Sequence, residues 1–287
     1  MDDVAYGVPK DFDSIAIFYN KEIFDRAGVA HPTAGWSLDE FKKTAASITE
    51  SLSADGVYGV AMVFEGQSTY YNTIFQNGGQ VISEDGTSSG YDSPETQAGI
   101  QFWVDILEEG ISPSVAQLTD TPGDEWFTSG RAAMYQGGNF DVKNIMNSDV
   151  AEHVGLVELP AGSQKATVFN GLANVVSHNT DNKVAADAFL AYLGTQQAAL
   201  IQSTAGTAAS AFIGTQGPWL ASQPGLDLQV FVDSGAEFGF AYPGSRNTSA
   251  WNQLENEILG SIWTGDLSVK EGTKKLAEQM NALLAKE

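Results

Sequence analysis

Short apolar runs alternate with amphipathic segments along most of this 287-residue chain, and this alternation restricts the possible folds. The first run, at 15–20 (IAIFYN), is β-branched and aromatic and predicts a buried strand. Ser37 and Glu40 have the spacing of a capping box, so we expect a helix from there to about Ser51. Strands that alternate with helices predict an α/β architecture with a mainly parallel sheet.

The same signals place the remaining elements. Further strands are predicted at 58–63, 131–135, 154–159 and 167–176. Gly137-Gly138 is expected to be a loop that leads into a short helix, and 204–225 is expected to be mostly loop. Other helices are predicted at about 70–78, 93–110, 121–130, 183–193, 196–203, 249–263 and 269–286, with Ser268 and Glu271 as a second capping box.

The composition excludes several classes of partner and chemistry. Fourteen Lys and Arg residues stand against 36 Asp and Glu residues, and the resulting net charge of −22 would repel nucleic acid and anionic lipid. The chain has no cysteine, which excludes disulfides and thiol catalysis. His31, His153 and His178 lie far apart, and no nucleotide or cofactor motif is present, so neither a metal nor a cofactor is predicted.

Two patterns leave other functions open. Asp11, Asp13 and Glu65 could supply the carboxylate pair of a glycoside hydrolase, which depends on a separation that sequence cannot provide. The excess of acid would also suit a binding protein for a cationic solute such as a polyamine. A GTSSG match at 86–90 lies in a polar turn rather than between a strand and a helix, so we interpret it as a turn and not as a nucleophile elbow.

Several short motifs occur in a fixed order along the chain. They are Tyr6-Gly7-Val8-Pro9, Tyr19-Asn20-Lys21-Glu22-Ile23-Phe24, Trp36-Ser37-Leu38-Asp39-Glu40-Phe41, the run from Phe127 to Phe140, the run from Val154 to Gly162, and Asn170-Gly171. Together they resemble the extracellular solute-binding proteins of carbohydrate ABC importers, a family that includes the maltose-binding proteins. Phe140 stands where that family usually has tryptophan.

The resemblance implies a periplasmic-binding-protein-like (type II) α/β fold. The C-terminal lobe would be essentially complete, at 16–170 plus 227–287, whereas 1–15 plus 175–226 would be hinge strands and a remnant of the N-terminal lobe. Family members carry roughly a hundred more residues before the Tyr6 segment, so we expect a truncated form of a longer protein or a misplaced gene start. The apolar faces of the remnant helices should then be exposed, mobile or buried against another copy (Phe189, Leu190, Leu193, Leu200, Ile201).

The resemblance also implies binding without catalysis. The expected function is that of the substrate-binding component of a sugar (oligosaccharide) importer, which would partner a carbohydrate ligand and membrane permease subunits. Self-association through the incomplete lobe is a further expectation. The expected location is extracellular or periplasmic, as a lipoprotein in the full-length form, although Met1-Asp2-Asp3 begins this chain without a signal. With part of the cleft missing, weak or no sugar binding is expected.

Sugar recognition uses hydrogen-bonding side chains together with aromatic faces. Tyr70, Tyr71 and Phe140 could equally be core residues, and Trp251 is expected to stack on a sugar ring. Matched to the family's positions, the expected ligand-binding residues are Asp13, Glu65, Gln67, Tyr70, Tyr71, Asn139, Phe140, Asn170, Gly171 and Trp251.

Overall fold

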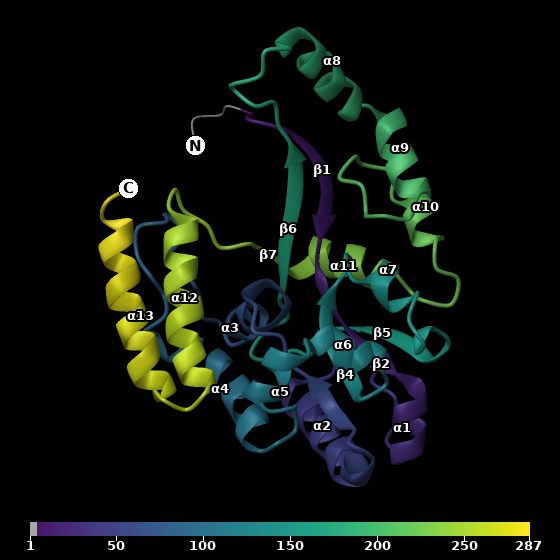
Figure 1. Ribbon diagram of the computed structural model, residues 1–287, viewed down its shortest axis with the longest axis vertical. Coiled ribbons are helices and arrows are strands. Elements are labelled where there is room, and N and C mark those ends of the chain that lie inside the picture. Colours follow the sequence, from purple (N-terminus) through teal and green to yellow (C-terminus); the bar gives the residue numbers. More distant parts are fainter. Residues whose placement is uncertain (1–4) are drawn as a thin grey trace.

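The computed structural model describes residues 5–287, and the strands of this part form two sheets (Figure 1). The larger sheet has the order β3-β4-β2-β5, made of Tyr58–Ala61 (β3), Ala132–Gly138 (β4), Ile15–Asn20 (β2) and Val154–Glu158 (β5). The smaller sheet has the order β1-β6-β7, made of Val8–Asp13 (β1), Thr167–Asn174 (β6) and Gly239–Ala241 (β7). The mixed α/β fold class is as predicted.

The expectation of a mainly parallel sheet is wrong. Strand β2 runs antiparallel to both β4 and β5, and β1 runs antiparallel to β6. Only the β3–β4 and β6–β7 pairs are parallel within residues 5–287. Several helices separate β2 from β4 along the chain, and a connection of that length can return a strand in either direction, so alternation alone does not determine its sense.

The predicted helices surround the larger sheet with small shifts of their ends, together with three helices that the sequence did not predict, Lys21–Ala27, Val115–Asp120 and Gln229–Phe238. In α2 (Leu38–Leu52) the capping box is present, since Ser37 Oγ accepts from Glu40 N and Glu40 Oε2 accepts from Ser37 N. The others around this sheet are α1 (Lys21–Ala27), η1 (Ser53–Asp55), η2 (Gly66–Tyr70, a π-helical turn), α3 (Tyr71–Gln76), α4 (Pro94–Glu108), α5 (Val115–Asp120), α6 (Gly123–Thr128), α7 (Val142–Ile145), η3 (Ala151–His153), α11 (Gln229–Phe238), α12 (Thr248–Trp263) and α13 (Val269–Leu284).

Both faces of β2 are buried, which explains its unbroken apolar sequence. Ile15 and Ile17 point into a core shared with α2, α4, α12 and α13, whereas Ala16 and Phe18 point into a second core. Trp219 and Phe231 lie in this second core. The segment around Trp219, which the sequence assigned to the smaller unit, is therefore packed against the large sheet.

Gly137-Gly138, predicted as a loop, is the end of strand β4. A Cβ on Gly137 would lie 2.2 Å from the Tyr135 ring, and one on Gly138 would lie 2.1 Å from the Phe140 ring. The glycines thus make room for aromatic rings that lie across the strand, a role that sequence alone does not distinguish from a turn.

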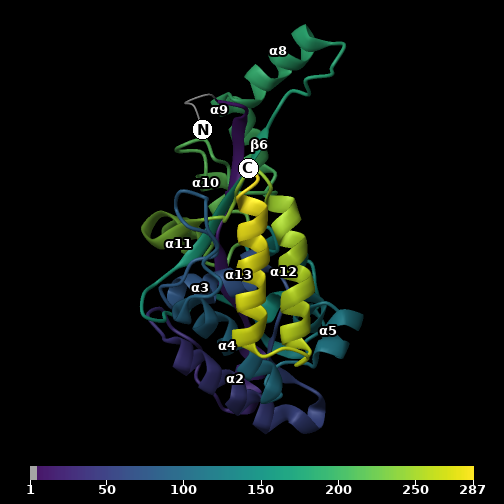
Figure 2. The same ribbon diagram turned by 90° about the vertical axis from the view of Figure 1, so that its left-hand side faces the viewer.

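Beyond the large sheet, β1 and β6 form a narrow ribbon that leads to α8 (Lys183–Leu193), α9 (Gln196–Thr204) and α10 (Gly217–Leu220). Figures 1 and 2 show α8 at the far end of this ribbon, well away from α12 and α13. Phe189, Leu200 and Ile201 are exposed, which confirms the predicted exposure of these faces, whereas Leu190 and Leu193 are half-buried. No helix among residues 5–287 is both long and apolar enough to cross a membrane.

Candidate ligand-binding site

The ribbon meets the large sheet where β1 passes through Ser14 into β2. There Asp13 lies opposite Asn170, and Phe12 lies opposite Gly171, across the antiparallel β1–β6 pair. The rings of Phe12 and Phe169 stack with their centroids 5.6 Å apart. Three of the predicted site residues, Asp13, Asn170 and Gly171, are therefore neighbours at this junction, which is the place of the expected hinge.

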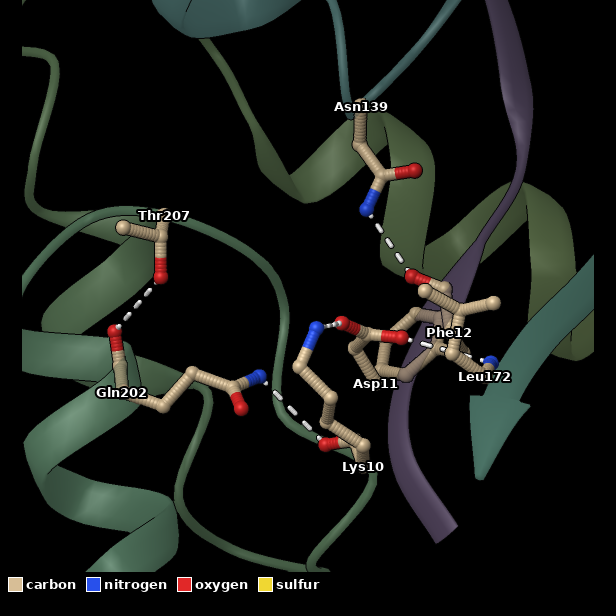
Figure 3. Close-up of polar contacts among 7 residues, drawn as sticks. All are labelled: Lys10, Asp11, Phe12, Asn139, Leu172, Gln202 and Thr207. Carbon is tan, nitrogen blue, oxygen red and sulfur yellow. Dashed lines mark hydrogen bonds and ion pairs between the residues drawn. The ribbon is translucent and has the colours of Figure 1, made fainter. Parts of the chain in front are cut away.

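Gly171 is required by the close approach of the two strands. A Cβ at this position would lie 2.6 Å from the backbone oxygen of Asp11, too close for any side chain unless the ribbon opens. The Asp11 carboxylate is buried and holds the strands together from the same place. It accepts from Leu172 N at 3.3 Å and pairs with Lys10 Nζ at 2.6 Å (Figure 3).

Gln67, in the η2 turn that follows β3, reaches the hinge, and Glu65 immediately precedes this turn. The Asn170 amide donates from Nδ2 to Gln67 Oε1 at 3.0 Å, which joins two predicted site residues directly. The Glu65 carboxylate caps the η2 turn by accepting from Gln67 N at 3.0 Å and from Ser68 N at 2.7 Å. Glu65 is therefore oriented by the backbone and remains partly exposed.

The hinge includes a carboxyl group, that of Asp13, whose pKa is unusually high. Burial, helped by the nearby Asp11 charge and opposed by Lys10, raises the pKa of Asp13 to about 6. Asp13 is half-buried, so a ligand at the hinge would meet a carboxyl that changes charge in the mildly acidic range.

A hollow of about 510 Å³ opens beside these residues. Asn170 and Gly171 line it together with residues absent from the predicted site, among them Phe12, Phe169, Leu172 and Tyr242. Aromatic faces beside an amide are a combination that suits a sugar ring, since the apolar C–H face and the hydroxyls need different partners. Phe169 could have been found from its position next to Asn170, whereas Tyr242 follows a three-residue strand without a sequence signal.

Asn139 has a structural role at the same junction. It is only 2% exposed, donates from Nδ2 to Phe12 O at 2.9 Å (Figure 3), and accepts at Oδ1 from Ser14 N at 3.2 Å. These bonds fasten the end of β4 to the hinge. Phe140, next in the chain, is 46% exposed and so has a face available to a ligand.

Of the ten predicted site residues only Asn170 and Gly171 line the hollow, and three of the others lie in the core. Tyr70 and Tyr71 are buried, and the Tyr71 hydroxyl donates to Glu255. Trp251 is fully buried, and its Nε1 donates to Ser245 Oγ at 3.0 Å. In this structure Trp251 has no exposed face, so the expected stacking on a sugar ring does not fit its position.

The ribbon is also tied to α9. Gln202 Nε2 donates to Lys10 O at 3.3 Å, and Thr207 Oγ1 donates to Gln202 O at 3.5 Å (Figure 3). An apolar cavity of about 410 Å³ lies between the ribbon and α9, lined by Val8, Leu193, Ala199, Phe212 and Ile213 among others. Among residues 5–287, no three His, Asp or Glu side chains are grouped so that they could hold a metal ion.

With this geometry in view, comparison with known proteins identifies the family. Residues 1–200 match the bacterial extracellular solute-binding proteins, and the chain belongs to that family. A curated binding protein of Brucella abortus is 27% identical over 189 residues, which cover 64% of this chain and 45% of that protein. The chain therefore spans less than half the length of this relative.

Solved structures share the fold over nearly the whole chain. The ABC substrate-binding protein Lmo0181 of Listeria monocytogenes, solved with cycloalternan, superposes with a TM-score of 0.89 at 23% identity, over 99% of this chain and 73% of that one. The GacH receptor of Streptomyces glaucescens gives 0.81 at 21% identity, over 99% and 72%. Maltose-bound MalE3 of T. maritima gives 0.79 at 19% identity, over 99% and 74%.

Proposed function

We propose that this chain supplies the hinge and the larger lobe of the substrate-binding component of a carbohydrate ABC importer. The observation that carries the proposal is the hinge hollow, which the stacked rings of Phe12 and Phe169 line together with Asn170. Proteins of the same fold support it, because the Listeria, Streptomyces and T. maritima structures were solved with cycloalternan, acarbose and maltose respectively.

Binding would need no bond to be made or broken. The bond from Asn170 Nδ2 to Gln67 orients the amide, so its carbonyl oxygen can accept from a ligand hydroxyl while the Asp13 carboxyl lies across the strand pair. A sugar held there would bias rotation about β1 and β6, where a few backbone angles can absorb a domain movement. The ligand-bound form would then be recognised by membrane permease subunits.

The location follows from the same proposal. A protein that delivers sugar to a permease works outside the cytoplasmic membrane, in the extracellular space or the periplasm. The family to which the chain belongs is extracellular, which supports this location. A lipid anchor on the full-length protein is part of the proposal.

The test is a titration of the chain with maltotriose, followed by backbone amide chemical shifts in NMR spectra. We expect weak binding that shifts signals around Asn170 and Tyr242. Asn170→Ala should weaken the affinity about two- to tenfold, because one neutral hydrogen bond contributes about 0.5–1.5 kcal/mol. Asn179→Ala, which changes an exposed loop amide, is the matched control.

Other outcomes would redirect the proposal. If no sugar in a panel shifts the NMR signals of the hinge residues even at millimolar concentration, the proposal that this chain binds carbohydrate at the hinge is wrong. Shifts caused by spermidine and by no sugar would favour a cationic solute. Release of nitrophenol from a nitrophenyl glycoside would instead show a glycoside hydrolase.

A further inference from the structure

A fully buried amide joins the two elements that carry Gln67 and Asn170. Asn72, in α3, is 0% exposed. Its Oδ1 accepts from Val168 N of β6 at 2.8 Å, and its Nδ2 donates to Gln67 O of the η2 turn at 2.7 Å. The Asn72 side chain is thus bonded at both ends, as a buried amide needs to be, and it fastens the η2 turn to β6.

These bonds close a ring beside the hinge hollow. Asn170 lies two residues after Val168 in β6, and its Nδ2 donates to Gln67 Oε1 at 3.0 Å. The ring therefore runs from Asn72 through Gln67 to Asn170 and returns along β6 to Val168. Because Gln67 is bonded both at its backbone oxygen and at its side-chain oxygen, the ring restricts how the Asn170 amide can turn.

Other contacts hold the rest of the η2 turn. Gln136 Nε2 of β4 donates to Thr69 O at 3.2 Å. A Cβ on Gly66 would lie 2.5 Å from the Tyr71 ring, so the turn packs directly against α3. The turn is π-helical, a form of backbone that often occurs at functional sites. Loss of the Asn72 side chain would therefore loosen the turn at Gln67 while these contacts keep the remainder in place.

The Gln67–Asn170 pair leaves one donor and one acceptor for a ligand. Gln67 Nε2 and Asn170 Oδ1 form no hydrogen bond with another group among residues 5–287, and both side chains are half-buried. An amide NH₂ group only donates and an amide oxygen only accepts, whereas each hydroxyl of a sugar does both. Two neighbouring hydroxyls of one ring can therefore be bound together, one by Gln67 and the other by Asn170.

We propose that Asn72 is a positioning residue of the ligand-binding site, which holds Gln67 and Asn170 as a fixed donor and acceptor pair for two neighbouring hydroxyls of the ligand. Asn72 is fully buried, so it acts through Gln67 and not by contact with the ligand. The part of this inference that concerns hydroxyls rests on the proposed function, whereas the dependence of the amide pair on Asn72 does not.

The first test needs no ligand and follows the side-chain amide signals of Asn170 in ¹⁵N-correlated NMR spectra of the full chain. These signals are assigned by their loss in Asn170→Ala. In the wild type, the amide proton that is donated to Gln67 should resonate downfield of a free amide proton. Asn72→Ala and Gln67→Leu should each return it toward the free value, because both remove the arrangement that holds the bond.

A double variant distinguishes positioning from general disruption. If Asn72 acts through Gln67, then Asn72→Ala should change the Asn170 signals no further once Gln67→Leu is in place. Asn77→Ala is the matched control. Asn77 lies at the other end of α3, where its Nδ2 donates to Thr73 O at 2.8 Å, so its loss should leave the Asn170 signals as in the wild type.

Two results would overturn the positioning role. One is a set of Asn170 signals that Asn72→Ala leaves unchanged, and the other is a pair of shifts that add in the double variant. If Asn72→Ala fails to fold, Asn72→Ser answers the same question, because a serine side chain is too short to bond to both Gln67 and Val168.

The second test is a titration with maltotriose. Asn72→Ala should weaken the affinity about two- to tenfold, as for the loss of one neutral hydrogen bond, and Asn77→Ala should not. Equal affinities of wild type and Asn72→Ala would overturn the part of the proposal that concerns ligand hydroxyls. An absence of sugar binding together with the expected Asn170 signals would contradict the proposed function and still confirm the positioning role of Asn72.

Discussion

Burial of the Glu255 carboxyl links the stability of the chain to pH. In the unfolded chain this group has its ordinary pKa of 4.5, whereas the folded chain raises the pKa to about 7. Between these values the unfolded state loses the proton first. The free energy of unfolding should therefore fall as pH rises from about 4.5 to about 7, by on the order of 3 kcal/mol from this group, and then level off.

Glu255→Gln should remove this contribution. Relative to wild type, the variant should gain stability between pH 5 and pH 8, on the order of 3 kcal/mol in the free energy of unfolding measured with urea. Glu257→Gln should follow the wild-type curve, because that side chain is exposed. Parallel curves for wild type and Glu255→Gln would mean that the folded chain does not hold a proton on this residue.

At the scale of elements, the β1–β6 ribbon depends on one glycine. Gly171→Ala would place a Cβ 2.6 Å from the Asp11 backbone oxygen and push the strands apart at the hinge. We expect a loss of about 1–3 kcal/mol in the free energy of unfolding, as for other overpacked sites. Differential scanning calorimetry would measure it.

The matched control is the same substitution in a helix. A Cβ on Gly260, within α12, would have nothing within 4 Å, so Gly260→Ala should be neutral or stabilising by about 0.5–1 kcal/mol. A Gly171→Ala variant as stable as Gly260→Ala would show that the ribbon can open at little cost. That result would mean that the β1–β6 ribbon deforms more easily at the hinge than its contacts indicate.

At the scale of the whole molecule, charge and exposed apolar surface are separated. Residues 170–226 contain only three charged side chains, Asp181, Lys183 and Asp187, although the chain has a net charge of −22. This segment also carries exposed apolar residues such as Phe189 and Ile201. Like-charge repulsion is therefore weakest where apolar surface is available, and we propose that two copies associate there.

Analytical ultracentrifugation should then show a mass that rises with concentration. Ile201 is 57% exposed, and Ile201→Asp should shift the chain toward the monomer by introducing a charge into the contact. Ser51→Asp, which adds the same charge to an exposed site at the end of α2, should leave association unchanged. A wild-type chain that is monomeric throughout would contradict the proposal.

Local signals determined most of the elements. The Ser37–Glu40 capping box, the apolar run of β2 and the ends of α8 could all be predicted because capping, strand propensity and helical periodicity act between residues close in sequence. The family motifs also predicted residues at the hinge. Asp13, Asn170 and Gly171 are neighbours there, and the Asn170 amide donates a hydrogen bond to Gln67.

Only the tertiary structure decided what depends on distant parts of the chain. Contacts between segments separated by many residues determine three features. They are the antiparallel direction of β2 relative to β4, the burial of Trp251, and the position of Tyr242 beside Asn170 in the lining of the hollow. Glu255 appears in sequence as one acid among 36, and only its burial in the folded core raises its pKa to about 7. Local sequence specifies the backbone, but desolvation and side-chain contact depend on what the fold brings close.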